Sequence, residues 1–330
     1  MSSVFNGRDG AATTRLVQRV LVLAGCLSTG CGGSQASTPG GTSTSTDAQP
    51  PSSDGYCADL TDDGGTVSEC HGPTPVDAGT CAPQFKPAGA GRCTVTATSV
   101  DCTPVISTVG GRQVYWQVPV GSPPERGWPA VIVFQGSLFG PDLSWSGGTG
   151  LPFGGLNQIR LQALLLDNGF AVIAPTTSNG LYWLTNFPGY DTSADNTFML
   201  ALLANIAAGT TFGAVDPKRL FATGISSGGF MTSRMAVTYP GHFAALAIES
   251  GGYATCPGCS SPLPALPVDH PPTLFLHGGM DDVVAPSYSR SYYDELIGQG
   301  VEGERIVDPN AGHQWLDVAP DAVTCWFLAH

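Results

Sequence analysis

The fold is indicated by residues 220–229, which read Leu-Phe-Ala-Thr-Gly-Ile-Ser-Ser-Gly-Gly. The stretch begins with a mostly apolar run typical of a buried strand, and the residues after Ser226 continue in the pattern of an amphipathic helix. Gly224 and Gly228 flank the serine in a Gly-x-Ser-x-Gly arrangement. A serine on a sharp turn between strand and helix needs small neighbours at both positions, because a Cβ atom there would clash. The stretch therefore predicts a strand, a sharp turn at Ser226 and a helix.

A base and an acid follow this serine in the chain. Residues 273–284 read Thr-Leu-Phe-Leu-His-Gly-Gly-Met-Asp-Asp-Val-Val, with two aspartates after an apolar strand. Residues 310–315 read Asn-Ala-Gly-His-Gln-Trp and place His313 after the last predicted strand. A hydroxyl becomes a nucleophile when a base takes its proton and a third group orients that base. The order Ser226, Asp281, His313 is the chain order of α/β-hydrolases.

Two further assignments complete the expected site. Asp281 is favoured as the acid, with Asp282 as the alternative; the other aspartate then caps the following helix or satisfies a turn. The expected oxyanion donors are the backbone N–H groups of Ser227, at the helix N-terminus, and of Ser137, after an early apolar strand. His313 is preferred to the other histidines, which lie at a strand end, at the C-terminus or before the acid.

Short apolar runs alternate with helical stretches from about residue 103 onward. The expected strands are Gln113–Val118, Ala130–Phe134, Ala171–Ala174, Leu220–Thr223, Ala244–Ile248, Thr273–Leu276 and Glu304–Val307. The expected helices are Leu156–Asn168, Ala194–Ala208, Ser227–Thr238, Ser287–Gly298 and Pro320–Ala329. Continuous apolar strands separated by helices predict an α/β fold, with a mostly parallel sheet and helices on both faces.

The composition excludes several classes of protein. Lys and Arg number 13 against 26 Asp and Glu, a net charge of −13, so the chain repels nucleic acid and anionic polymers. Its 44 Gly and 27 Pro lack a Gly-X-Y period, which excludes a collagen-like fibre. The cysteines lack the paired spacing of a zinc site and are better explained as structural disulfides.

The N-terminus carries the features of an export signal. Arginines precede the apolar residues 20–25, and residues 23–26, Leu-Ala-Gly-Cys, resemble the bacterial lipobox. We therefore expect residues 1–25 to be a lipoprotein signal peptide and Cys26 to be lipidated. The alternative is an ordinary signal peptide with a chance cysteine. The protein is expected outside the cytoplasm, either secreted or held at the cell envelope by a lipid anchor, its only membrane contact.

Residues 26–53 and 54–102 differ in composition. The first segment is rich in Ser, Thr, Gly and Pro and is expected to be a disordered tether. The second holds five cysteines and few large apolar side chains, so it needs disulfides to hold its shape. If Cys26 is lipidated and Cys31 is free, the five cysteines of this segment can pair only with one another or with the three beyond it. Because five is an odd number, full pairing requires at least one disulfide from this segment to the rest of the chain. We expect an extension clamped to a catalytic domain at residues 103–330.

Eight paired cysteines allow many connectivities. Cys256 and Cys259, two residues apart in a Cys-Pro-Gly-Cys run, are the expected local pair. The other connections stay open.

The last two thirds of the chain resemble secreted polyhydroxybutyrate depolymerases and feruloyl-esterase-like α/β-hydrolases. The resemblance is carried by residues 224–229, 239–245, 277–284 and 312–315. It places the nucleophile, acid and base of the family on Ser226, Asp281 and His313. In one departure, the usual His-Gly pair before the oxyanion donor is Gln135-Gly136 here.

The resemblance implies a serine hydrolase of carboxylic esters, acting through an acyl-enzyme and needing neither metal nor organic cofactor. The expected substrate is a polyhydroxyalkanoate-type polyester or a related short-chain ester; the alternative is a feruloyl or acetylxylan ester of plant polysaccharide. Two other classes remain: a serine peptidase, and a non-catalytic binding lipoprotein. No nucleic acid and no obligate protein partner is expected.

Three tryptophans are candidates for substrate contact. Trp145, Trp183 and Trp315 stand in predicted loops near the carboxyl ends of strands, where α/β proteins bind ligands. Their rings would suit an apolar polyester or a phenolic acyl group. The alternative is that they pack loops over the core.

Overall fold

The computed structural model describes residues 67–70, 81–185, 189–254 and 263–330. All of these residues lie in one unit, Leu60–His330. The predicted signal peptide, Cys26 and the tether lie outside the described residues, as do Cys256 and Cys259.

Nine of the described strands form a central sheet, with apolar runs at its middle. Their order is β1 (Val67–Cys70), β12 (Gly303–Asp308), β11 (Thr273–Gly278), β10 (Phe243–Glu249), β9 (Val215–Ile225), β6 (Trp128–Phe134), β8 (Ala171–Pro175), β5 (Arg112–Gln117) and β4 (Val105–Val109). The strands from β12 to β8 run parallel, and β1, β5 and β4 join antiparallel at the edges. The buried middle strands are apolar on both faces, as parallel sheets require.

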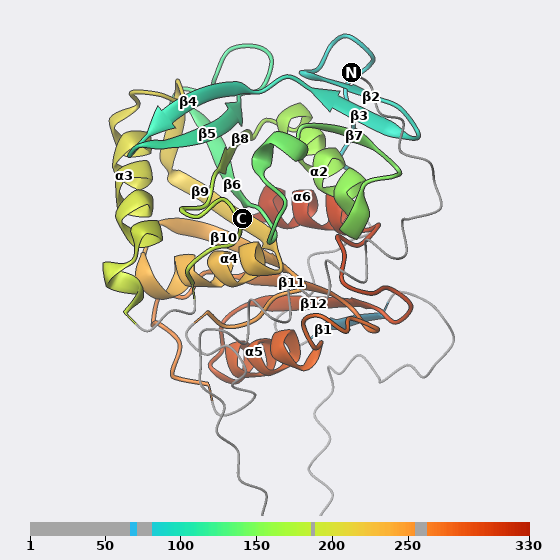
Figure 1. The fold of residues 1–330 in the computed structure, drawn as a ribbon, viewed down its shortest axis with the longest axis vertical. Coiled ribbons are helices and arrows are strands. Elements are labelled where there is room, and N and C mark those ends of the chain that lie inside the picture. Colours follow the sequence, from blue (N-terminus) through green and yellow to red (C-terminus); the bar gives the residue numbers. More distant parts are fainter. Residues whose placement is uncertain (1–66, 71–80, 186–188, 255–262) are drawn as a thin grey trace, which may run out of the picture. The chain divides into compact units, whose positions relative to one another are not determined.

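Helices cover both faces of this sheet (Figure 1). Val131 and Val133 of β6 share one core cluster with α2 (Gly155–Asp167) and α6 (Ala319–Ala329). Ile132 and Phe134 point the other way, to α3 (Ala194–Ala208) and α4 (Ser227–Thr238), and α5 (Ser287–Gly298) packs on β10 and β11. The predicted α/β-hydrolase fold is confirmed. None of the helices in the described part of the chain is long and apolar enough to cross a membrane.

A second, smaller sheet involves the N-terminal extension. It contains β2 (Cys93–Val95), β3 (Ser99–Cys102) and β7 (Ser146–Gly148), all antiparallel. A disulfide joins Cys93 to Cys102, which are register partners on β2 and β3. Val100 and Cys102 are buried in the core cluster that contains α2. Residues 93–102 therefore share a core with α2 and the main sheet.

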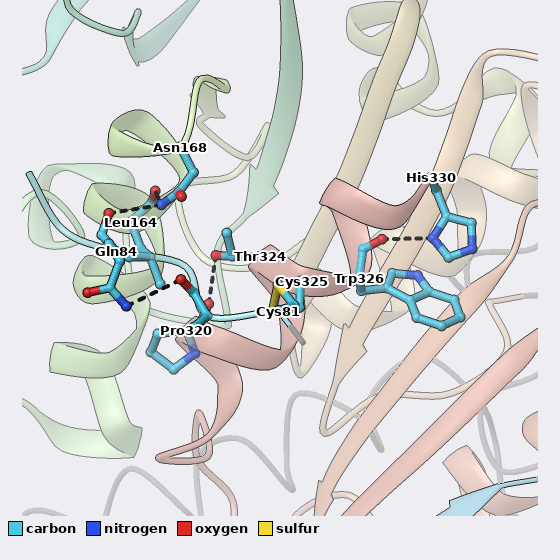
Figure 2. Close-up of a disulfide and its surroundings, with 10 residues drawn as sticks. Cys81, Gln84, Leu164, Asn168, Pro320, Thr324, Cys325, Trp326 and His330 are labelled. Atoms are coloured by element: carbon cyan, nitrogen blue, oxygen red, sulfur yellow. Dashed lines mark hydrogen bonds between the residues drawn. A yellow bond between two sulfur atoms is a disulfide. The ribbon is translucent and has the colours of Figure 1, made fainter. Parts of the chain in front are cut away.

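A second disulfide ties the extension to the C-terminal helix. Figure 2 shows Cys81 bonded to Cys325 on α6. Close by, the carbonyl oxygen of Gln84 accepts a hydrogen bond of 3.2 Å from Asn168 Nδ2, and Lys86 N donates to Asp167 Oδ2 at 2.9 Å. This is a bridge of the kind that the odd number of cysteines requires. Structural disulfides are formed in oxidising compartments, so the protein is extracytoplasmic.

The two disulfides should differ in their effect on stability. A cross-link restricts the unfolded chain more as the loop that it closes lengthens. The disulfide between Cys81 and Cys325, which are 244 residues apart, should therefore stabilise the fold more than that between Cys93 and Cys102, which are 9 apart. We expect the double variant Cys81→Ala/Cys325→Ala to lose about 4 to 5 kcal/mol of unfolding free energy, and Cys93→Ala/Cys102→Ala under about 3. Urea unfolding under oxidising conditions measures both, and equal losses would contradict the expectation.

Candidate active site

The turn at Ser226, the predicted nucleophile, joins β9 to α4. Ser226 has φ 58° and ψ −122°, a backbone conformation that residues other than glycine rarely adopt. A Cβ atom on Gly224 would lie 2.6 Å from the carbonyl oxygen of Phe134, and one on Gly228 would lie 2.1 Å from it. The backbone N–H of Ser226 donates to the carbonyl oxygen of Glu249 at 3.0 Å. The turn therefore holds the serine at the carboxyl edge of the sheet, and only glycine fits on either side.

The acid and the histidine meet at the same edge of the sheet. His313 Nδ1 lies 2.7 Å from Asp281 Oδ2, and both side chains are buried. The other oxygen, Oδ1, accepts from the backbone N–H groups of Val283 at 2.9 Å and Val284 at 2.8 Å. An ionised carboxylate only accepts hydrogen bonds, so Nδ1 carries the imidazole proton and Nε2 is left as a base. Asp282, the alternative acid, is exposed.

The backbone explains how these two loops come together. The strands β11 and β12 are parallel neighbours, so their carboxyl ends lie side by side. Gly279 N donates to the carbonyl oxygen of Asp308 at 2.7 Å, and Met280 N donates to that of Ala311 at 2.9 Å. A Cβ atom on Gly278 would lie 2.1 Å from the carbonyl oxygen of Gly312. The loop with the acid and the loop with the histidine are thus joined backbone to backbone.

The predicted oxyanion donors also lie beside the serine. Ser227 is the first residue of α4, and its Oγ accepts a hydrogen bond of 2.8 Å from Trp183 N. Ser137 follows Gly136, where an added Cβ would lie 4.0 Å from Ser226 Cβ and 3.1 Å from the Ile225 side chain. The loop after β6 therefore lies against the turn at Ser226.

Several known proteins are similar to this chain in sequence. Over 228 residues the chain is 50% identical to the poly(3-hydroxyoctanoate) depolymerase of Pseudomonas fluorescens, a match that covers 67% of this chain and 81% of the relative. The chain belongs to the polyhydroxybutyrate depolymerase and esterase-like family of α/β-hydrolases. Members of this depolymerase family are ester hydrolases, and this chain is one.

Other known proteins match a smaller part of this chain or are less similar to it. Feruloyl esterase B of Neurospora crassa is 33% identical over 141 residues, which are 42% of this chain and 45% of the esterase. The crystal structure of esterase PE8 covers 65% of this chain and 96% of its own, with a TM-score of 0.47 and 19% identity. No protein-family model matches the sequence.

A second histidine contacts Asp281, the predicted acid. His277 is fully buried, and its Nε2 lies 2.9 Å from the carbonyl oxygen of Val284 and 3.3 Å from Asp281 Oδ2. Both neighbours are acceptors, so Nε2 carries the proton. Sequence reasoning considered His277 only as a rival to His313. Its position four residues before Asp281 was the signal available for this contact.

Two buried carboxyl groups near the serine differ in the direction of their pKa shifts. Burial would raise the pKa of Asp281, but hydrogen bonds from His277 and His313, and the charge of His313, hold it well below its usual range. Burial raises the pKa of Glu249, at the end of β10, well above its usual range. The Leu316 backbone N–H opposes this shift, and the charge of Asp281 reinforces it. The environment therefore favours the ionised form of Asp281 and the protonated form of Glu249.

Glu249→Gln should change how stability depends on pH. Below the ordinary pKa of 4.5, Glu249 is protonated in both folded and unfolded chains. Above this pH, Glu249 ionises only in the unfolded chain. The wild type therefore loses up to about 1.4 kcal/mol of unfolding free energy per pH unit, until the pH reaches the pKa of Glu249 in the folded protein. The variant lacks this loss, and its stability relative to wild type should increase from about pH 5 to about pH 8.

Urea unfolding at both pH values measures this difference. The exposed residue Glu125, replaced by glutamine, serves as the matched control and should show no such trend. A Glu249→Gln difference that stays constant with pH would show that Glu249 ionises normally in the folded protein.

The three predicted substrate-binding tryptophans require a correction. The exposed fractions of Trp145, Trp183 and Trp315 are only 2%, 3% and 1%. Trp183 Nε1 donates to the carbonyl oxygen of Gln135, and Trp315 Nε1 donates to Gln158 Oε1. Their rings belong to the hydrophobic core clusters, so they are core residues and offer no platform to a substrate. Two half-buried aromatic residues next to the site, Phe139 and Phe153, were not among the candidates predicted from the sequence.

No metal-binding group emerges from the described residues. Nowhere among them do three or more His, Cys, Asp or Glu side chains gather in an arrangement that could hold an ion. A serine, a histidine and a carboxylate suffice for acyl transfer.

Proposed function

We propose that the protein cleaves the ester bonds of a polyhydroxyalkanoate-type polyester, with Ser226 as nucleophile, His313 as general base and Asp281 as the orienting acid. The observation that carries the catalytic assignment is the 2.7 Å contact between His313 and Asp281, at the carboxyl edge of the parallel sheet where β9 ends just before Ser226, with β10 between β9 and β11. The 50% identity to a poly(3-hydroxyoctanoate) depolymerase supports the substrate class.

The reaction follows from these positions. His313 Nε2 takes the hydroxyl proton as Ser226 Oγ attacks the ester carbonyl. The backbone N–H groups of Ser227 and Ser137 stabilise the oxyanion, and Asp281 stabilises the imidazolium. The intermediate expels the alcohol, which receives the proton from His313. Water activated by His313 then attacks the acyl-enzyme, releases the acid and restores Ser226. No other reactant is consumed.

A feruloyl ester is the second candidate substrate. The 33% identity to feruloyl esterase B supports it, over 42% of this chain. Amide substrates have no such support, because none of the curated relatives described above is a peptidase. The net charge of −13 disfavours an anionic polymer.

The N-terminal organisation is part of the proposal. We infer that residues 1–25 are removed, that Cys26 carries a lipid, and that residues 26–53 tether the extension at 54–102 to the membrane surface. Residues 103–330 then form the catalytic domain. Detergent-phase partitioning of the protein expressed in bacteria, compared with Cys26→Ser, tests the anchor. If Cys26→Ser partitions into the detergent phase as the wild type does, the lipid anchor at Cys26 is refuted.

Release of soluble hydroxyacids from amorphous polyhydroxyoctanoate tests the substrate. p-Nitrophenyl butanoate serves as the activity control, and an arabinoxylan ferulate as the competing substrate. Hydroxyacid release by the wild type supports a depolymerase. Hydrolysis of the nitrophenyl ester and the ferulate without polymer release would transfer the assignment to feruloyl esters. Absence of all three activities would refute the proposed function.

A further inference from the structure

Phe153 has an unusual backbone beside His313. Its φ is 55° and its ψ 33°, in the left-handed region that costs a residue with a side chain about 1 to 2 kcal/mol. The next residue, Gly154, also has a positive φ, and a Cβ atom there would lie 2.3 Å from the carbonyl oxygen of Trp315. The backbone N–H of Trp315 donates to the carbonyl oxygen of Phe153 at 3.0 Å. The strained turn is therefore fixed to the chain just after His313.

The side chain of Phe153 contacts both sides of the site. Its ring packs edge-on against His313, with 6.0 Å between ring centroids, and edge-on against Phe139, with 5.8 Å. Phe139 belongs to the loop after β6, and its N–H donates to the carbonyl oxygen of Gly136, next to Ser226. Contacts thus run from the nucleophile turn through two aromatic rings to the base.

The exposure of these rings distinguishes them from the core. Phe139 and Phe153 are both half-buried, whereas the tryptophans nearby are fully enclosed. A ring needed only for packing would be stabilised most by complete burial. Here both residues keep part of their surface in solvent, and the left-handed backbone of Phe153 lies where its ring packs against His313. Strain of this kind is commonly retained at functional sites.

We propose that Phe139 and Phe153 form an apolar wall that binds an alkyl chain of the ester and sets the preference for chain length. This inference rests on the proposed function and specifies the part of the ester that these two residues bind. A longer alkyl chain covers more of the wall and loses more contact with water, so it gains binding in the transition state. Short esters extend less far and depend less on the two rings.

Substitutions at Phe153 test the wall in the full chain. Phe153→Ala and Phe153→Gly both remove the ring, but only glycine adopts φ 55° without strain. The ratio of kcat/KM for p-nitrophenyl octanoate to that for the butanoate should fall about tenfold in both variants, and in Phe139→Ala. Phe153→Gly should unfold at a higher temperature than Phe153→Ala, which separates the ring from the backbone. Glycine also provides a folded variant if alanine fails.

A matched control and a second pair of esters complete the test. Phe85 is exposed in the N-terminal extension, and its neighbours bind the far end of α2, so Phe85→Ala should keep the wild-type ratio. Ethyl acetate and hexyl acetate vary the alcohol instead of the acyl group. A fall in the ratio for either pair supports the wall and identifies the side of the ester that it binds.

Two outcomes would overturn the proposal, and they differ in what else they affect. Unchanged ratios in both ester pairs, with the wild type active, would overturn the wall and leave the ester hydrolase intact. A wild type that hydrolyses none of these esters would overturn the wall together with the proposed function.

Discussion

Ser226→Ala should reduce kcat/KM for every ester by about 10⁵-fold or more, because no acyl-enzyme can form without the hydroxyl. The fold should be unaffected. Alanine keeps the Cβ atom, so the strain of the turn at φ 58° does not change, and the hydrogen bond from the backbone N–H to Glu249 remains. Hydrolysis of p-nitrophenyl butanoate and thermal unfolding, measured on one preparation, check both halves of the expectation.

Labelling by a fluorophosphonate provides the control for this variant. The wild type should be labelled once, and Ser226→Ala should not be labelled. Ser122, exposed in the loop between β5 and β6, is the matched control, and Ser122→Ala should be labelled as the wild type is. Turnover or labelling that survives in Ser226→Ala would assign the nucleophile elsewhere.

Asp281→Asn should lower kcat by about 10⁴-fold through the tautomer of the histidine. The backbone N–H groups of Val283 and Val284 require an acceptor, so the asparagine oxygen takes the place of Oδ1. The amide NH₂ then faces His313 Nδ1, where the wild type has an acceptor. Nδ1 can bond to this donor only after losing its proton, which moves to Nε2, and the histidine no longer serves as a base.

The neighbouring aspartate offers the matched comparison. Asp282→Asn changes the same functional group at an exposed position and should keep activity close to that of the wild type. Initial rates with p-nitrophenyl butanoate measure both variants, and circular dichroism verifies that they are folded. Equal losses in the two variants, or full activity in Asp281→Asn, would remove Asp281 from the catalytic group.

The main sheet was predictable because its strands are buried on both faces. Continuous apolar residues in β6, β8, β10 and β11 left few alternatives, and the helices between them followed from their periodicity. The strand β4 was missed because its first four residues, with Ser107 and Thr108 among them, are exposed or half-buried at the sheet edge. The strands β2 and β7 are only three residues long, so no period can be recognised in them.

In the candidate site, some residues could likewise be predicted from the sequence and others could not. The proposed nucleophile, acid and base follow strand ends, and the parallel strands bring their loops to one edge of the sheet. The support around them depends on contacts across the fold. Phe153 reaches His313 because a left-handed turn is fixed to Trp315, and no local pattern predicts that turn. The tryptophans were assigned wrongly because a place near a strand end does not determine whether a ring is buried.

The Cys81–Cys325 disulfide also has a consequence for survival among extracellular proteases. Every loop from residue 82 to residue 324 lies between its two half-cystines. A single proteolytic cut in any of these loops therefore yields two fragments that stay covalently joined. The nicked enzyme keeps Ser226, Asp281 and His313 in one molecule, and only reduction of the disulfide lets the pieces separate.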